Sequence, residues 1–157
     1  MAPTCIFIAC SDPRLNKASV QRDWAVRMIV GFGEAEVISL YVPGPTRLFI
    51  GKPPPSEVEE ICKIREGLLA CISCHLRGHR LQAAVFAGHN DCLLHPECDE
   101  LATAVATQEL QCILRSGGYT GPVLAAFETI KDGTWESMEM LPPEMQPDAF
   151  VSERIAA

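Results

Sequence analysis

The sequence predicts an α/β fold: a mainly parallel four-stranded sheet with an antiparallel fifth strand at one edge, and helices on both faces. Short, β-rich and nearly continuous apolar runs over 4–9 and 82–88 are typical of strands buried on both faces. A helical pattern follows each run, and strands that alternate with helices build parallel sheets. Near the end of the chain, 134–140 alternates in polarity after a turn at 131–133, which predicts the antiparallel edge strand.

The first half of the chain supplies two strands and one helix. After the strand over 4–9, apolar spacing predicts a helix over 16–31 that ends at a glycine pair, and then a second strand over 36–42. The prolines and glycines of 43–56 exclude a regular helix there. Because this loop is longer than most connections, it is a candidate lid or interface element.

The second half continues the alternation. Ser56 with Glu59 fits a capping box, and apolar residues then recur at helical spacing to about Gly78. Three elements follow: the strand over 82–88, a helix over 97–115 closed by Gly117-Gly118, and a fourth buried strand over 122–129. These assignments complete the predicted sheet.

Length and composition predict one domain. The chain has 157 residues and is 48% hydrophobic, which is enough for one well-buried core. We expect a single zinc-binding domain over 1–140. The segment 141–157 contains three prolines and little periodicity, which predicts a C-terminal surface tail.

Composition also argues against several classes of function. No apolar stretch approaches the ~20 residues of a membrane span and no basic region precedes a long apolar segment, so we expect a cytoplasmic protein without membrane contact. A formal charge of −7 with 13 basic residues argues against a nucleic-acid partner. In a chain without a signal peptide, eight cysteines predict reduced thiols and metal ligation rather than disulfides.

Two fragments supply residues with metal-binding chemistry: CSDPR at 10–14 and HNDC at 89–92. Each follows a predicted parallel strand, and the carboxyl ends of such strands line one edge of a sheet, so the fragments should meet. Together they offer the thiolates of Cys10 and Cys92 and the imidazole of His89. This ligand set with one open position suits a Zn²⁺ ion that does chemistry, because a structural zinc closes its fourth position with protein.

Asp12 and Arg14 follow the first of these cysteines in the same strand-to-helix turn. The carboxylate of Asp12 can occupy the fourth zinc position or accept a hydrogen bond from bound water, while the Arg14 guanidinium keeps it ionised. The alternative is a surface ion pair of little energetic weight. We favour a functional dyad.

The two fragments resemble the C-x-D-x-R and H-x-x-C motifs of the β-class carbonic anhydrase family. The resemblance covers two fragments on matching strands, so it is much more specific than an H-x-x-C string alone. It implies that Cys10, His89 and Cys92 are zinc ligands, and that Asp12 and Arg14 form the carboxylate–guanidinium dyad beside the metal.

Other positions agree with this family or depart from it. Gly88 matches the glycine before the histidine, and GEAEVI at 33–38 resembles the G-D-A-x-V-I that leads into the second strand. Pro13 stands where the family usually has serine, residues 40–45 replace an R-N-A-G-N-like turn, and Leu93 replaces a glycine. The order of the predicted elements agrees over about residues 4–140.

The resemblance implies reversible hydration of carbon dioxide to bicarbonate by a zinc-bound hydroxide. It also implies a homodimer or higher homo-oligomer, which would associate through helix or edge-strand surfaces because the first strand begins close to Met1. Two alternatives stay open. The same site could hydrolyse carbonyl sulfide or carbon disulfide, or it could be a non-catalytic zinc site that Asp12 closes.

Two further strings contain ligand-type residues. CISCH at 71–75 has the C-x-x-C-H spacing of covalent haem attachment, but it lies in an amphipathic pattern that predicts ordinary helix cysteines. HPEC at 95–98 is a second H-x-x-C string. Pro96 favours the start of a helix there, although metal ligation by His95 and Cys98 stays open.

Overall fold

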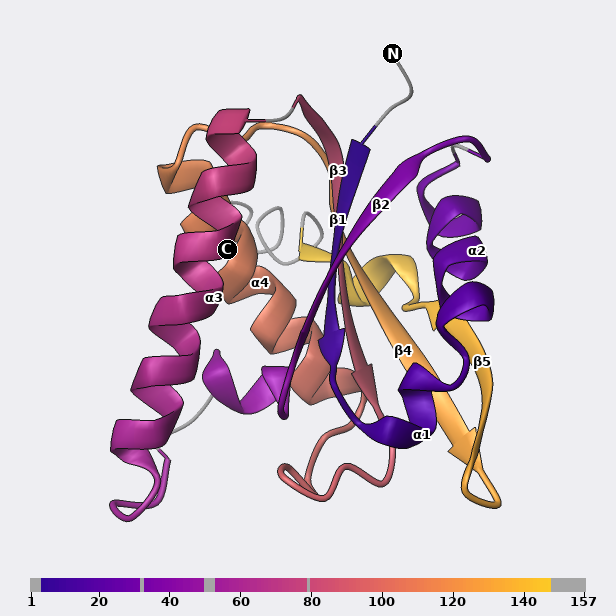
Figure 1. Ribbon diagram of the computed structural model, residues 1–157, viewed down its shortest axis with the longest axis vertical. Helices are drawn as coiled ribbons and strands as arrows, with labels where there is room; N and C mark the ends of the chain where they lie inside the picture. Colours follow the sequence, from indigo (N-terminus) through magenta and orange to yellow (C-terminus); the bar gives the residue numbers. More distant parts are fainter. Residues whose placement is uncertain (1–3, 32, 50–52, 79, 148–157) are drawn as a thin grey trace.

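Five strands form one sheet in the order β2-β1-β3-β4-β5 (Figure 1). The strands are β1 (Thr4–Cys10), β2 (Glu36–Val42), β3 (Leu81–His89), β4 (Val123–Lys131) and β5 (Thr134–Met140). β1 to β4 pair in parallel, whereas β5 pairs with β4 in antiparallel orientation. The structure is a computed structural model that describes residues 4–31, 33–49, 53–78 and 80–147. The predicted fold class is confirmed.

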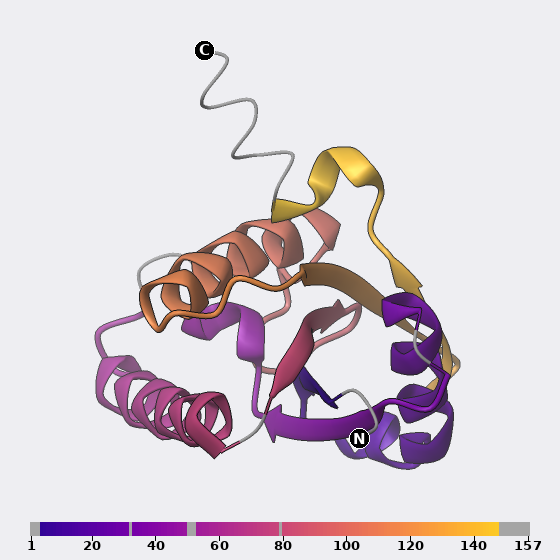
Figure 2. The ribbon, with the colours of Figure 1, turned by 90° about the horizontal axis from the view of Figure 1, so that it is seen from above.

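Helices cover both faces of the sheet (Figures 1 and 2). The α-helices are α1 (Pro13–Asn16), α2 (Ser19–Val30), α3 (Val58–Gly78) and α4 (Glu100–Ser116), and two short 3₁₀ helices are η1 (Pro45–Leu48) and η2 (Pro143–Met145). α1 and α2 lie on one face, and α3 and α4 lie on the other. Within the described residues, no helix combines the length and the apolar character that a membrane crossing requires.

β1 separates two hydrophobic cores because successive side chains of a strand point to opposite faces. Cys5 and Phe7 pack with residues of α2, whereas Ile6 and Ile8 pack with residues of α3 and α4. All seven residues of this strand are buried. The continuous apolar run therefore has the two-sided burial that its sequence predicts.

The helix predicted over 16–31 is interrupted. The chain forms the single turn α1 first, because the Asp12 carboxylate accepts a hydrogen bond from the Arg14 N–H at 2.8 Å and Pro13 occupies the first helical position. The Ala18 N–H then donates to the Leu15 carbonyl, and α2 begins only at Ser19. The prediction missed this break because the cap lies upstream of the apolar periodicity.

Two other predicted helix starts are wrong by a few residues. α3 begins at Val58, and the Glu57 carbonyl accepts its first hydrogen bond, so Ser56 is not the capping residue. α4 begins at Glu100 rather than near 97, because the Asp99 carboxylate accepts a hydrogen bond from the Ala102 N–H at 2.7 Å. Both helices end as predicted, at Gly78 and just before Gly117-Gly118.

The loop predicted over 43–56 contributes to the core in its described part. Leu48 and Phe49 are buried, and the Phe49 ring meets the Phe86 ring of β3 edge to face at 5.8 Å between centroids. Residues 50–52 lie outside the described residues. Residues 45–49 are buried, so this part of the loop packs as core, and a role as lid or interface element stays a prediction.

The segment after β5 packs against the sheet as far as residue 147. Leu141 is buried, and its N–H donates to the Ala125 carbonyl of β4 at 2.9 Å. The Gln146 amide binds both the N–H and the carbonyl of Ala125. Of the predicted surface tail over 141–157, residues 148–157 lie outside the described residues, and residues 141–147 extend the domain.

Candidate metal centre

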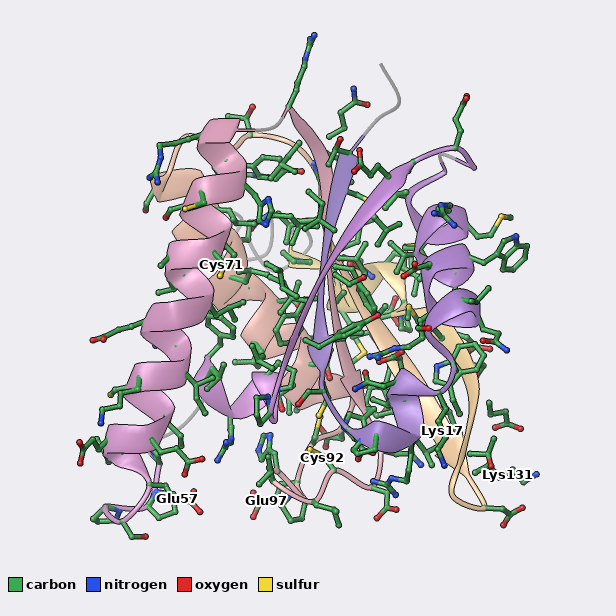
Figure 3. The ribbon with its side chains drawn as sticks, viewed as in Figure 1. Lys17, Glu57, Cys71, Cys92, Glu97 and Lys131 are labelled. Carbon is green, nitrogen blue, oxygen red and sulfur yellow. The ribbon has the colours of Figure 1, made fainter. Side chains whose placement is uncertain are left out.

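The ends of β1 and β3 bring three ligand-type side chains together. Cys10 is the last residue of β1, His89 is the last residue of β3, and Cys92 follows in the next loop. The sulfurs and an imidazole nitrogen all lie within 4.8 Å of one another, and all three residues are buried. Figure 3 shows Cys92 at this edge of the sheet, next to the strand ends. The group predicted from the sequence therefore assembles, and it could hold a metal ion.

The His89 ring is oriented by its neighbour. Nδ1 lies 2.7 Å from the Asn90 carbonyl oxygen, a distance at which the ring donates its proton to that oxygen. Nε2 is buried and has no hydrogen-bond partner among the described residues. An unsatisfied buried nitrogen is costly, and an imidazole fixed by its other nitrogen is a common arrangement of metal-ligating histidines. The ring therefore fits a metal ion at Nε2.

The first of the two thiol protons is lost more easily than from an isolated thiol. The neighbouring Cys92 thiol lowers the pKa of Cys10 to about 4 against the opposing effect of burial, and His89 lowers it further. The Cys10 sulfur and burial in turn raise the pKa of Cys92. Burial, the largest single effect, lowers the pKa of His89, but the Cys10 sulfur, the Asn90 carbonyl and the Glu128 carboxylate together outweigh it, and the net shift is upward. Negative charge therefore collects on sulfur, as a soft cation requires.

Backbone groups of two loops affect the pKa values of the thiols. The backbone of Gly44 lowers the pKa of Cys10, and the backbones of Leu94 and His95 act to lower that of Cys92 against the larger opposing effects. Gly44 has a positive φ of 53°, and a Cβ at this position would lie 3.0 Å from Nε of Arg47. A side chain here would therefore crowd Arg47 and Leu94. This turn belongs to the segment that departs from the family pattern.

Asp12 and Arg14 form a close pair beside the three ligands. Arg14 Nε and Nη2 donate to the two carboxylate oxygens of Asp12 at 3.1 and 2.7 Å. The side-chain hydrogen bond from Arg14 is the largest effect on the pKa of Asp12, which is lowered although burial opposes it. The dyad thus holds an ionised carboxylate next to the candidate metal site.

Arg14 also links the two fragments through Asp91. Its Nη1 donates to Asp91 Oδ2 and its Nη2 to the Asp91 carbonyl, both at 2.7 Å. Asp91 has a positive φ of 54°, which turns its backbone carbonyl and side chain toward the guanidinium. The sequence analysis missed Asp91, and its position between two ligands in the H-x-x-C string was the signal available.

Asn90 anchors the same loop to β4. Its amide donates to the Ile130 carbonyl at 2.8 Å and accepts from the Ile130 N–H at 2.6 Å. These two bonds satisfy backbone groups of β4 that lie beyond the last β3–β4 pair, His89 with Glu128. The loop between His89 and Cys92 is therefore fixed from both sides.

The two other ligand strings add no ligand to this group, although Cys98 packs in the same buried cluster as Cys10 and Cys92. Cys71 and Cys74 are exposed on α3, and Figure 3 shows Cys71 on that helix. His95 Nδ1 lies 2.6 Å from Thr46 Oγ1, and Cys98 is buried close to the backbone of Gly88. Among the described residues, neither string joins a group of three metal-ligating side chains.

Fold and site together define an α/β domain with a buried Cys₂His group at the carboxyl ends of adjacent parallel strands. No protein-family model and no curated protein sequence matches the chain. Among solved structures, the β-carbonic anhydrase CafA of the fungal pathogen Aspergillus fumigatus is similar at 15% sequence identity and a TM-score of 0.44. The match covers 98% of this chain and 83% of that one.

Proposed function

We propose that this chain is a zinc enzyme that reversibly hydrates carbon dioxide to bicarbonate. The observation that carries the proposal is the buried group of Cys10, His89 and Cys92 beside a carboxylate that Arg14 holds. Three protein ligands leave zinc a fourth position, as catalytic zinc sites do. The resemblance of both fragments to the β-class carbonic anhydrase motifs supports the same reaction.

Zinc bound to these ligands would supply hydroxide near neutral pH, because it lowers the pKa of its water. The protein's own residues define where that chemistry takes place. Arg14 holds both oxygens of Asp12: Oδ1 accepts from its backbone N–H and Nε, whereas Oδ2 accepts only from Nη2 and keeps a free lone pair with which to accept a further hydrogen bond. Asp12 can therefore orient a donor at the site, and its ionised state is maintained by the guanidinium.

The test is a stopped-flow assay of carbon dioxide hydration on protein whose zinc content has been measured. One zinc per chain and hydration well above that of buffer are expected. Fully zinc-loaded protein without hydration activity would contradict the proposal. The Asp12→Ala variant, loaded with zinc, serves as the matched control because it keeps all three ligands.

Two assays separate the alternatives. Hydrolysis of carbonyl sulfide or carbon disulfide by the same sample, without hydration of carbon dioxide, would favour the hydrolase. The hydrolase assay is motivated by the segment 42–45 beside Cys10, because this segment replaces the turn usual in the family. Zinc ligated by Asp12 at every pH would favour the non-catalytic reading, which the contacts from Arg14 to Asp12 oppose.

We further propose that the chain forms a homodimer or higher homo-oligomer in the cytoplasm. Val20, Trp24 and Met28 lie four residues apart on α2 and are 78%, 62% and 57% exposed. Such a stripe is self-complementary when two copies of α2 pack antiparallel about Trp24. The eight free cysteines, four of them exposed, fit a reducing compartment. A monomeric mass by light scattering at micromolar concentration would contradict the association, and Trp24→Glu should abolish it.

A further inference from the structure

A buried ion pair lies behind the candidate metal centre. Arg22 of α2 and Glu128 of β4 are both 0% exposed. Arg22 Nε and Nη2 donate to the two carboxylate oxygens of Glu128 at 2.6 and 2.8 Å, and Trp135 Nε1 donates to one of them at 3.2 Å. The guanidinium also lies 4.4 Å from the centroid of the Tyr41 ring. Neither charged residue takes part in the function proposed above.

Such a pair is not explained by stability alone. Removing two charges from water costs free energy that their attraction repays only in part, and apolar replacements of similar volume are often neutral or stabilising. Arg22 and Glu128 lie in a layer that is otherwise apolar, between α2 and the sheet. The groups that the ion pair contacts must therefore explain why it is present.

Arg22 contacts the backbone of Cys10, and Glu128 lies in β4 beside His89. Arg22 Nη2 donates to the Cys10 carbonyl at 3.3 Å. Glu128 is the β4 residue in register with His89, and its carbonyl accepts the Asn90 N–H at 3.3 Å. The ion pair therefore joins the residue that carries one sulfur to the strand position beside the imidazole.

The rest of the contacts make this connection rigid. Arg22 Nη1 donates to Asn16 Oδ1 at 3.3 Å, and the Asn16 amide donates to the Ser11 carbonyl at 3.0 Å. The guanidinium thus holds the turn after Cys10 at two points. Because a guanidinium is planar and presents a fixed fork of donors, a lysine at this position could not make all these bonds.

We propose that Arg22 and Glu128 are positioning residues that set the geometry of the Cys10 and His89 ligands for the metal. The pair acts through the backbone of those residues and not on substrate. The inference rests on the metal site of the proposed function, but it does not depend on which reaction that site performs.

The test compares metal binding in the wild type with the double variant Arg22→Met/Glu128→Leu, which removes both charges and keeps an apolar layer. Zinc affinity is measured by competition with a chromophoric chelator, and site geometry by the absorption bands of the cobalt(II) form. We expect affinity to fall ~10- to 100-fold, as when other groups that orient metal ligands are removed, and the cobalt bands to shift. Arg22→Lys should give a smaller loss.

Val26→Ala is the matched control, since Val26 is fully buried on α2 and packs in the layer that does not contain Cys10. It should weaken the packing of α2 and leave zinc affinity and the cobalt spectrum as in the wild type. An equal loss of affinity in this control would overturn the positioning role, because any loosening of α2 would then suffice.

Unchanged affinity and spectrum in the folded double variant would also overturn the inference. If the double variant does not fold, Arg22→Lys is the variant that tests the inference. Wild-type zinc affinity and a wild-type cobalt spectrum in Arg22→Lys would overturn the inference. A wild-type protein that binds zinc but does not hydrate carbon dioxide refutes the proposed function and leaves this inference standing. A wild-type protein that binds neither zinc nor cobalt refutes both.

Discussion

The chain carries two H-x-x-C strings six residues apart, and they have different fates. In the first, His89 and Cys92 meet Cys10 with their ligand atoms within 4.8 Å. In the second, His95 turns to Thr46 and Cys98 packs beside Gly88. The spacing of the ligand residues is identical, so spacing does not account for the difference.

Position relative to the sheet does account for it. His89 ends β3, which lies directly beside β1, so its side chain emerges next to Cys10. The Asn90 side chain and the Arg14 contacts to Asp91 then fix the turn that brings Cys92 back. His95 lies in the connection to α4, and its ring contacts Thr46 instead of the ligand group. A ligand pair becomes a site when the surrounding backbone places a third ligand opposite it.

The largest effect is expected from removing a ligand of the first string. His89→Ala or Cys92→Ser should lower zinc affinity by more than the ~10- to 100-fold expected when a group that only orients a ligand is removed. Either variant should also lower the stability of the zinc-loaded protein, because metal binding is linked to folding. Zinc content after dialysis against chelator and thermal unfolding measure both effects.

The matched control is Cys98→Ser in the second string, together with Cys71→Ser and Cys74→Ser on α3. Each should keep one zinc per chain. An empty site in any of these controls, or near-stoichiometric zinc after loss of His89 or Cys92, would require a different ligand set.

The next largest effect is expected from removing the contacts of Arg14 with Asp12 and Asp91, which only the first string has. Arg14→Ala and Asp12→Ala should keep zinc and lower the rate of carbon dioxide hydration ~10- to 100-fold, because the carboxylate is removed or loses the group that holds it. Asp91→Asn should have a smaller effect, since the Asp91 carbonyl still accepts from Arg14. Wild-type rates in both alanine variants would show that the dyad is only a surface ion pair.

Gly88 precedes His89 of the first string and packs against Cys98 of the second. A larger residue at this position should therefore disturb both strings. A Cβ at this position would collide with Thr103 Oγ1 and lie 3.1 Å from the Cys98 sulfur. Gly88→Ala should therefore destabilise the protein by about 1–3 kcal/mol, measured by denaturant unfolding. Adding Thr103→Ala should recover part of the loss, whereas Thr103→Ser keeps the hydroxyl and should not. Equal recovery of stability when Thr103→Ala or Thr103→Ser is added to Gly88→Ala would argue against a steric cause.

The smallest effect is expected at the second string. His95→Phe removes the contact to Thr46 and should cost about 1 kcal/mol with zinc content unchanged. Burial lowers the pKa of His95 from its ordinary 6.5, so the folded protein favours the neutral ring. The wild type should therefore lose stability as pH falls below that value and the unfolded chain takes up the proton. His95→Phe should lose less over the same range, and parallel pH profiles for the two proteins would contradict the assignment.

Local sequence rules predicted most of the fold and the ligands of the candidate site. Apolar runs and the Asp132-Gly133 turn predicted the strands, and the strand ends placed Cys10 and His89 at one edge. The helix starts were less accurate, because the capping carboxylates of Asp12 and Asp99 precede the periodic residues that define a helix in sequence.

The sequence by itself determined the order of elements, the burial of β1 and the residue types available to a metal. Each depends on side-chain chemistry or on a period of two or about four residues, and both are visible within a short segment of the sequence. Only the tertiary structure decided that Arg14 would meet Asp91, 77 residues away, and that Arg22 would meet Glu128, 106 residues away. Polar partners so distant in sequence leave no local periodicity, because the sheet brings them together only once its strands have paired.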